Sequence, residues 1–320
     1  MDVLCGLFGK SRQGWYDAIK RADEEQVWDA ILYHEIRRIR INQPNSGLRK
    51  LYHLFLPFCE TWGIKMGRDK LGDFMRENSL FIRKKAYRVQ TTHSFHRFHK
   101  YPNKTKGLIL TKRNQLWVTD ITYVRLKDKQ GEFAYLTLIT DAYSRKIVGW
   151  CLFKTLSTQG CLVALKQALS TLTKAETAGL VHHSDRGIQY CSDAYTSLLT
   201  DFKFGPIEIS MTQNGDPYEN ALAERMNRTI KEEMLNNRIF DTFEQAKDAI
   251  DRAIKEYNQV RPHQSIDFLT PEIAHNRTGD IPKRWKKYPY KPKNSCPDMT
   301  SLAAPKAHAV GGFKTTTTTF

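Results

Sequence analysis

Three acidic residues in the middle of the chain have the type and spacing needed for metal-dependent chemistry on a phosphodiester. Asp120 lies in LWVTDITYV, Asp185 in LVHHSDRGIQY and Glu224 in ENALAERMNRTIKEE. The first two follow short β-type runs and the third lies in a helical pattern, so two strands and a helix could deliver one carboxylate each. Carboxylate oxygens suit Mg²⁺ or Mn²⁺, and two such ions can hold the attacking and leaving oxygens of a phosphodiester. We therefore predict that these three residues bind two divalent cations.

The helical run around Glu224 has an apolar side and a polar side. At 100° per residue, one side collects Leu222, Met226, Ile230 and Met234, and the other collects Asn220, Glu224, Arg228 and Lys231. Glu224 is therefore expected outside the core. Arg228 and Lys231 could offer positive charge to a DNA phosphate beside the carboxylate. The simpler alternative is a solvated helix face with an ion pair between residues four apart.

The two aspartates occupy different positions on their strands. Val118, Asp120 and Thr122 share one face of a strand, where a buried aspartate is costly without a partner or a metal. An edge strand with a solvated carboxylate is the alternative. Asp185 follows a short apolar run and precedes a glycine, so we expect it at a strand end beside a loop, where α/β sites are usually built. A turn-forming aspartate is the competing interpretation.

Six phrases surround these residues in a fixed order and span about residues 4–274. They are CGLFGKSRQGWY, WVTDITYV, YLTLITDAYSRKIVGW, HHSDRGIQYCS, SMTQNGDPYENALAERMNRTIKEE and YNQVRPHQSIDFLTPEIA. Through them the chain resembles the catalytic subunit, the second-frame or OrfB-type product, of bacterial insertion-sequence transposases of the IS-three family, with an integrase-like D-D-E core. The resemblance implies a DNA transposase, with Asp120, Asp185 and Glu224 as the catalytic and metal-binding residues.

The resemblance also implies a reaction and partners. Water would free a 3′-hydroxyl at the end of the element, and this hydroxyl would attack another phosphodiester without a covalent protein intermediate. Double-stranded DNA, further copies of the chain and a first-frame (OrfA-type) product, separate or fused, are the implied partners. A retroviral-type integrase or a ribonuclease H is the enzymatic alternative. A non-catalytic DNA-binding protein or an inactive transposase remnant is the alternative of another class.

One spacing departs from the family pattern. Between Asp185 and Glu224 lie 38 residues, three more than the family usually leaves, and we expect the additional residues in the loop 201–206. Glu219 is a competing third carboxylate. Its place in YENALAE, however, matches the family's residue five positions before the catalytic glutamate, so Glu224 is preferred.

The order of predicted elements indicates an RNase H-like, retroviral-integrase-like α/β core. Strand-type runs at 115–125, 133–140 and 146–153 are followed by a helix at 158–172 and a fourth strand at 180–183. In this fold the first and fourth strands lie side by side, which would place Asp120 near Asp185. His183 could assist a metal site, although a strand-end histidine with satisfied hydrogen bonds is the simpler role.

The formal charge of +16 is unevenly distributed along the chain. Residues 1–113 hold 23 Lys and Arg against 11 Asp and Glu, residues 114–275 hold 18 against 21, and residues 276–320 hold 9 against 2. A nearly neutral centre between basic flanks is expected of an enzyme whose flanks hold DNA phosphates. We therefore predict a helical DNA-binding region at 1–90, a basic linker at 91–113, the catalytic core at 114–275 and a basic, disordered low-complexity tail at 276–320.

The N-terminal region shows a helix, a short glycine-containing break at 62–67 and a second helix. This order is typical of a helix-turn-helix-like module, with Lys65, Arg68 and Lys70 where a DNA-contacting helix would begin. A plain two-helix hairpin is the alternative. The longest helical pattern, from residue 220 to about 260, contains no zipper of apolar heptads, so the first-frame product is expected to supply one.

Other features exclude some classes of protein. No run approaches the roughly 20 apolar residues of a membrane span, and the N-terminus lacks the pattern of a signal peptide. The six cysteines show no C-x-x-C pair, so a disulfide framework or a zinc site is not expected. We expect a cytoplasmic, nucleoid-associated protein without a membrane partner.

Overall fold

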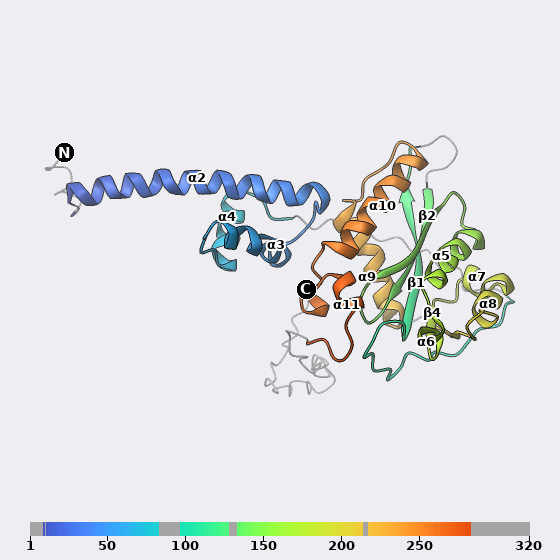
Figure 1. The fold of residues 1–320 in the computed structure, drawn as a ribbon. Coiled ribbons are helices and arrows are strands. Elements are labelled where there is room, and N and C mark those ends of the chain that lie inside the picture. The colour runs from blue at the N-terminus through green and yellow to red at the C-terminus, as the bar shows by residue number, and fades with distance from the viewer. Residues whose placement is uncertain (1–8, 10, 83–96, 128–132, 214–216, 283–320) are drawn as a thin grey trace, which may run out of the picture. The chain divides into compact units, whose positions relative to one another are not determined.

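The central element of the computed structural model is a mixed five-stranded sheet; the model describes residues 9, 11–82, 97–127, 133–213 and 217–282. The strands are β1 (Leu116–Arg125), β2 (Phe133–Asp141), β3 (Ile147–Phe153), β4 (Val181–Ser184) and β5 (Glu208–Met211). Their order is β3-β2-β1-β4-β5 (Figure 1). β2 is antiparallel to β1 and β3, whereas β4 is parallel to β1 and β5. The predicted adjacency of the first and fourth strands is confirmed.

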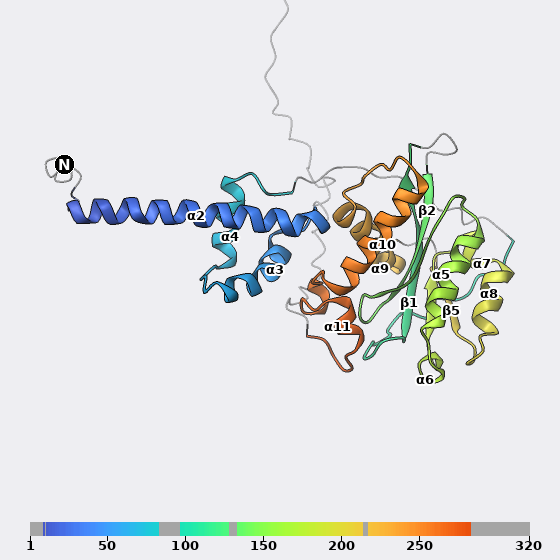
Figure 2. The same ribbon diagram turned by 45° about the horizontal axis from the view of Figure 1, so that its top comes forward.

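Helices cover both faces of this sheet, as Figures 1 and 2 show. One face is covered by α5 (Thr158–Ser170), α7 (Ile188–Cys191) and α8 (Asp193–Thr200), and the other by α9 (Ala221–Arg228), the π-helical turn η2 (Thr229–Met234) and α10 (Phe243–Gln259). Successive strand residues point to opposite faces. Trp117 and Ile139 therefore enter the first core, while Leu136 and Leu138 pack with Met226 in the second. A sheet buried on both faces gives the strands their nearly continuous apolar sequences.

Helix α5 lies unusually close to β3 at Gly149. A Cβ atom at this position would lie 2.3 Å from the carbonyl oxygen of Ala164 and 3.0 Å from the Cβ of Ala168. Because the obstructing atoms belong to the helix backbone and to an alanine, no side chain can move aside. The glycine in the phrase YSRKIVGW is therefore required for packing and not for chemistry.

The loop 201–206 joins α8 to β5, where the additional residues were expected. Gly205 has a φ of 119°, and the rings of Phe202 and Phe204 meet edge to face at 5.5 Å. The loop closes on itself through a hydrogen bond from Gly205 N to Phe202 O. It therefore forms a compact connection between the helix α8 and the edge strand β5.

The helical run that begins at residue 220 is broken at Asn236 and Asn237. Both asparagines have positive φ angles, 51° and 52°, and the chain resumes in α10 behind the Thr242 N-cap. The remaining short elements of the core are α6 (Lys174–Thr177), η1 (Pro217–Asn220), η3 (Gln264–Ile266) and α11 (Pro271–His275). The π-helical turn inside the run was not predicted, because side-chain pattern alone does not distinguish it from an α-helix.

The N-terminal helices have a hydrophobic core of their own within the compact unit 1–284. They are α2 (Arg12–Asn42), α3 (Leu48–Thr61) and α4 (Arg68–Glu77). Leu51 and Phe55 of α3 pack with Leu71 and Met75 of α4, and Gly63 turns the chain between them with a φ of 64°. The predicted succession of helix, glycine turn and helix is confirmed.

The length of α2 contradicts the expectation that the longest helical pattern begins at residue 220. α2 has 31 residues, more than any other helix in the described part of the chain. Leu32 and Ile36 of its C-terminal half enter the core, while Trp15 and Val27 are exposed. Its apolar residues do not follow a single stripe, so the helix period was not visible in the sequence.

Two expectations lie at least partly outside the described residues. Of the basic linker, residues 91–96 are not described, and of the basic tail only residues 276–282 are. Across the described ranges, no helix has both the length and the apolar character needed to cross a membrane.

Replacing Gly149 with alanine should lower the free energy of unfolding by about 1–3 kcal/mol or more, because the added methyl overlaps the backbone of α5. Chemical denaturation of the two proteins measures the change. Gly67→Ala is the control: open space surrounds Gly67 at the start of α4, so its cost should stay below about 1 kcal/mol. Equal stabilities of Gly149→Ala and the wild type would contradict the close approach.

Candidate active site

Asp120 lies on the face of β1 that is covered by α9. Its Oδ1 accepts a hydrogen bond from the backbone N of Ile121 at 2.9 Å, and its Oδ2 accepts one from Asn227 Nδ2 at 2.8 Å. The carboxylate is half-buried on a central strand, so the edge-strand alternative does not apply. Asn227 thus fixes the orientation of Asp120 from the opposite layer.

Asp185 follows the end of β4, immediately beside β1. The parallel register pairs Val118 with His183, so continuing it by two residues brings Asp120 and Asp185 to the same level. The Oδ1 of Asp185 accepts a hydrogen bond from the backbone N of Gly187 at 2.9 Å. This is the strand-end position beside a turn that the sequence predicted.

The charges of Asp185 and Glu224 act on Asp120. Burial, followed by the charge of Asp185 and, more weakly, that of Glu224, raises the pKa of Asp120 to about 8, despite hydrogen bonds from Ile121 and Asn227 that lower it. Asp185 and Glu224 are therefore both near enough to disfavour the ionised form of Asp120. A divalent cation is the kind of ligand that would relieve this concentration of negative charge.

Glu224 is exposed on α9 between two asparagines that hold the helix against β1. Asn220 Nδ2 donates to the carbonyl oxygen of Thr119 at 3.1 Å, and Asn227 binds Asp120. Residues 220, 224 and 227 share one helix face at the i, i+4, i+7 spacing. The sequence analysis placed Asn220 on the polar face of the helix without assigning it a role, and it did not name Asn227. The spacing of both asparagines from Glu224 is the pattern that could have identified them.

The three carboxylates are not yet gathered as a complete metal site. Within the described ranges, no group of three or more His, Cys, Asp or Glu side chains is arranged so as to hold an ion. Asp120 and Asp185 are anchored by backbone and side-chain hydrogen bonds, whereas Glu224 is on the surface.

Glu219, the competing glutamate, is occupied in the loop that precedes α9. Its carboxylate accepts a hydrogen bond from the backbone N of Gln213 and lies 3.3 Å from Lys106 Nζ. The hydrogen bond from Gln213 is the main reason that the pKa of Glu219 is lowered. The carboxylate of Glu219 is therefore already paired with Gln213 and Lys106.

His183 connects β4 to this same loop. Its Nε2 lies 3.1 Å from the carbonyl oxygen of Glu219 and its Nδ1 lies 2.8 Å from Ser210 Oγ. Because a carbonyl oxygen only accepts, we assign the ring proton to Nε2, and burial lowers the pKa of His183. Both ring nitrogens are satisfied, as the simpler interpretation of this histidine expected.

The two cations predicted beside Glu224 have different surroundings. Arg228 is exposed and forms a 3.8 Å ion pair with Glu232, so the expected pair on this face does not involve Glu224. Lys231 is half-buried within η2, where burial lowers its pKa, and it lies near enough to Asp120 to be influenced by that charge. The wider π turn changes the side-chain spacing on which the prediction for Lys231 was based.

Lys65, Arg68 and Lys70 belong to the N-terminal helices and not to the carboxylate site. All three are exposed, Lys65 in the turn after α3 and the others in the first turn of α4. Arg68 forms a 2.7 Å ion pair with Asp69. This arrangement leaves the positive charge of the turn accessible to solvent.

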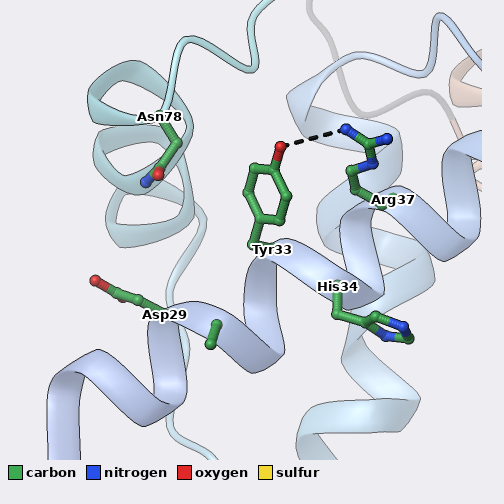
Figure 3. Close-up of a pocket in the computed structure, with 6 residues that line it drawn as sticks. Asp29, Tyr33, His34, Arg37 and Asn78 are labelled. Carbon is green, nitrogen blue, oxygen red and sulfur yellow. Dashed lines mark hydrogen bonds between the residues drawn. The ribbon is translucent and has the colours of Figure 1, made fainter.

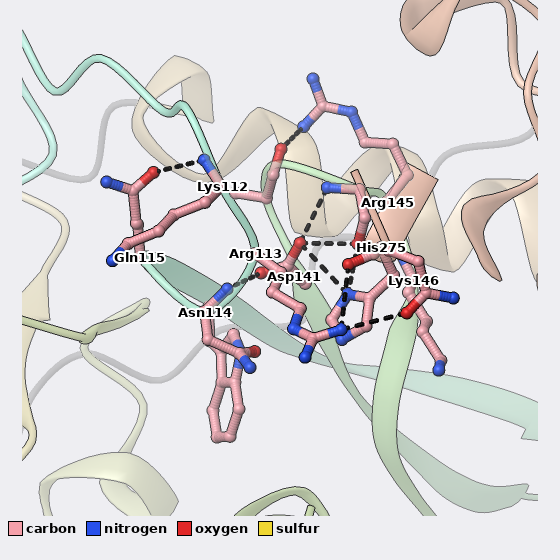
Figure 4. Close-up of polar contacts among 12 residues, drawn as sticks. Lys112, Arg113, Asn114, Gln115, Asp141, Arg145, Lys146 and His275 are labelled. Carbon is pink, nitrogen blue, oxygen red and sulfur yellow. Dashed lines mark hydrogen bonds and ion pairs between the residues drawn. The ribbon is translucent and has the colours of Figure 1, made fainter. Parts of the chain in front are cut away.

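A second buried carboxylate, Asp141 at the end of β2, has a structural environment (Figure 4). It accepts hydrogen bonds from the backbone N of Asn114 at 2.8 Å, the backbone N of Ser144 at 2.7 Å and Ser144 Oγ at 2.6 Å. Ser144 Oγ in turn lies 2.9 Å from His275 Nδ1 of α11. Asp141 therefore fastens the β2–β3 turn to the start of β1 and to α11.

A hollow of about 480 Å³ lies on the N-terminal helices (Figure 3). Its lining residues are Asp29, Ala30, Tyr33, His34, Arg37 and Asn78. Within it, Arg37 Nη1 donates to Tyr33 Oη at 3.3 Å. None of the predicted site residues lines this hollow.

Comparison with known proteins identifies the family. Models of the integrase core domain match residues 111–217 and 206–271. The IS600 uncharacterized 31 kDa protein of Shigella sonnei is 33% identical over 273 residues, covering 84% of this chain and 96% of that protein. The transposase InsF of insertion sequence IS3A from Escherichia coli is 31% identical over 293 residues, covering 86% and 93%. The chain belongs to the insertion-sequence transposases of the IS-three family.

The transposase assignment confirms the resemblance drawn from the six phrases. The protein is a DNA transposase of the integrase type, a polynucleotidyl transferase with an RNase H-like catalytic core. Among solved structures, the catalytic core domain of BIV integrase is 16% identical and covers 51% of this chain and 93% of that domain, with a TM-score of 0.37. The family assignment rests on the sequence relatives and not on that weak likeness.

Asp120→Asn should become progressively more stable than the wild type as the pH rises. The pKa of Asp120 in the fold, about 8, lies above the ordinary value of 3.8, so its contribution to stability is full below about pH 4 and is lost as the pH rises through about 8. Asparagine does not ionise. Thermal unfolding without divalent metal should show the gap widening by several degrees between about pH 5 and pH 9, since 1 kcal/mol corresponds to about 2–4 °C.

Asp73→Asn, on the exposed surface of α4, is the matched substitution outside the carboxylate site. A gap between Asp120→Asn and the wild type that stays constant with pH would show that the pKa of Asp120 is not raised in the fold.

Proposed function

We propose that Asp120, Asp185 and Glu224 are the catalytic residues of this transposase and bind its divalent metal ions. The observation that carries the proposal is the hydrogen bond from Asn227 of α9 to Asp120 of β1, in a sheet whose β1–β4 register brings Asp185 to the level of Asp120. Asp141 provides the contrast, because its charge is met by three hydrogen-bond donors and belongs to the scaffold.

The choice of Glu224 over Glu219 is supported by their neighbours. Glu224 influences Asp120 and lies between Asn220 and Asn227, which both bind β1. Glu219 is engaged by Gln213 and Lys106. A glutamate that is exposed and close to the aspartates suits a ligand that joins the site when metal and DNA bind.

The donor set suits magnesium or manganese. All three side chains offer carboxylate oxygens, which hard divalent cations prefer. Integrase-like cores generally use divalent metal ions, and we propose two Mg²⁺ or Mn²⁺ ions here. When bound, they would activate the attacking oxygen and stabilise the leaving oxygen.

The side chains of the transposase have separate tasks in this proposal. Asn227 holds Asp120 at Oδ2, and the backbone N of Gly187 holds Asp185 at Oδ1, so both aspartates are preorganised. Water attacks phosphorus at the end of the element and the 3′ oxygen leaves as a hydroxyl. This hydroxyl then attacks a target phosphodiester and displaces the target's own 3′ oxygen. The strand is at no stage bonded to the protein.

We also propose the division of labour along the chain. Residues 1–90 would form a DNA-binding region with Lys65, Arg68 and Lys70 on its surface, 91–113 a basic linker, 114–275 the catalytic core and 276–320 a basic tail. The separate hydrophobic core of α2 to α4 supports the first boundary. Arg228 and Lys231 would contact DNA phosphates beside the site. Action on DNA supports a cytoplasmic, nucleoid-associated location and assembly of several copies on the element ends.

Asp120→Ala, Asp185→Ala and Glu224→Ala should each reduce Mg²⁺-dependent cleavage by about 10³-fold or more, because each removes a metal ligand worth several kcal/mol in the transition state. DNA affinity should stay within about twofold, since it depends mainly on the basic residues. Nicking of duplex DNA carrying the element's ends measures the rate.

The matched comparison for this set is Glu219→Gln, which should keep most of the cleavage activity and lower the melting temperature, because Gln213 loses a charged partner. Activity retained in Glu224→Ala but lost in Glu219→Gln would transfer the role to Glu219. Wild-type nicking by all the alanine variants would favour a non-catalytic DNA-binding protein.

Lys231→Ala should slow strand transfer and reduce the slope of log affinity against log salt by about one. The reason is the loss of one charge that lies near both Asp120 and the DNA in this proposal. Filter binding at several salt concentrations measures the slope, with Lys255→Ala, an exposed lysine of α10, as the control. An unchanged slope and rate would leave Lys231 as an ordinary helix residue.

The purified chain should bind DNA with a steep salt dependence and little preference for the element's ends. Its exposed cations contact phosphates, which carry little sequence information. Adding or fusing the first-frame product should confer cleavage specific to the ends. Competition between end-containing and unrelated duplexes measures the preference, and selective cutting by the chain alone at physiological salt would contradict this partner role.

A further inference from the structure

The turn between α2 and α3, residues 43–47, is buried against the end of η2. Gln43 and Ser46 are 1% and 0% exposed, although loops usually lie at the surface. The backbone N of Asn45 donates to the carbonyl oxygen of Glu233 at 3.1 Å, and Asn45 Nδ2 donates to that of Glu232 at 2.6 Å. The last carbonyl groups of a helix lack partners within the helix. Asn45 therefore caps the helical run that carries Glu224.

The side chain of Glu233 makes a second connection between the same elements. Arg261 donates to its two oxygens through Nε and Nη2, each at 2.9 Å, and Lys50 of α3 contacts both oxygens as well. The side chains are nearly enclosed, with exposed fractions of 13% for Glu233, 3% for Arg261 and 18% for Lys50. A single carboxylate thus joins α3, η2 and the arginine of the phrase RPHQS.

The pKa shifts of Glu233 and Lys50 are those expected of a carboxylate that is shared between two cations. Burial works to raise the pKa of Glu233, but the hydrogen bonds and charges of Arg261 and Lys50 outweigh it and lower the pKa. Burial and the neighbouring Arg261 lower the pKa of Lys50 to about 8, so Lys50 is still mainly charged at pH 7. Removing one member would leave a buried charge without full compensation.

Two further contacts widen the connection between the N-terminal helices and the core. Gln43 Nε2 donates to Glu256 Oε1 of α10 at 3.0 Å, and the rings of His53 and Phe268 stack at 4.9 Å. The run α9 and η2 is continuous, with Glu224 and Asn227 in α9 and Glu233 in η2. A displacement of α3 would therefore act directly on the helix that approaches Asp120.

We propose that Glu233 is a positioning residue that, through Lys50 and Arg261, couples the N-terminal helices to the helix bearing Glu224. The proposal rests on the assignment of Glu224 to the catalytic site. In it, Asn45 and Lys50 hold the C-terminal end of the run while Asn220 and Asn227 hold α9 on β1. The position of the DNA-binding helices and that of Glu224 are thereby linked without any contact of Glu233 with DNA or metal.

The test uses Lys50→Met in the full chain at pH 7, because this change leaves the Glu233–Arg261 pair within the core intact. Hydrogen exchange of the amides in 221–234, measured without metal or DNA, should become about tenfold faster, while exchange in β1 to β3 stays unchanged. The single-turnover cleavage rate at saturating DNA and Mg²⁺ should fall by about five- to tenfold with an unchanged DNA dissociation constant. Asn45→Ala should produce the same pair of effects by removing the cap.

Two controls define the result. Lys50→Arg keeps the charge and should restore slow exchange and most of the rate, and Lys255→Met removes an exposed lysine of α10 and should change neither. Unchanged exchange in 221–234 in both Lys50→Met and Asn45→Ala would overturn the proposal. Faster hydrogen exchange together with a wild-type cleavage rate would also overturn it. A slower cleavage rate that is explained entirely by weaker DNA binding would do the same. Wild-type cleavage by Glu224→Ala would instead refute the catalytic assignment, and the exchange result would still decide whether the helices are coupled.

Discussion

The architecture depends on holding negative charge on a sheet that is covered on both faces. A carboxylate in such a place is unfavourable unless donors or cations compensate it. The protein meets this constraint in two ways. Asp141 is surrounded by amide and hydroxyl donors and acts as a fixed joint of the scaffold. Asp120 has two donors but also two neighbouring carboxylates, and burial together with these charges raises its pKa to about 8.

The sheet and the location of the aspartates could be predicted because they depend on local patterns. The alternating run around Asp120, the short apolar run before Asp185 and the glycine-containing turns indicate strands and their order. A parallel neighbour for β1 then follows from the fold, and the observed register brings the two aspartates together. The six phrases also identified the family, since their order extends over most of the chain.

Other features could not be read from the sequence because they depend on the tertiary structure. The hydrogen bond from Asn227 to Asp120 joins a helix to the sheet through two residues that are 107 positions apart in the chain. The π turn in η2 changes the angular spacing assumed for Lys231. The region 1–90 was predicted to be helical, but the length of α2 was not, because its apolar residues do not follow a single stripe. In each case the side-chain pattern is compatible with a simpler structure.

The loop between α8 and β5 can change in length without changing the contacts that position the carboxylates. α9, which carries Glu224, is held against β1 by the hydrogen bonds of Asn220 and Asn227, and β5 is aligned by its pairing with β4. The number of residues in 201–206 enters neither relationship. Related transposases can therefore differ in the interval between the second aspartate and the glutamate, and the interval itself is no measure of catalytic competence. The same loop is a suitable position for an inserted epitope or fluorophore that must leave the carboxylates undisturbed.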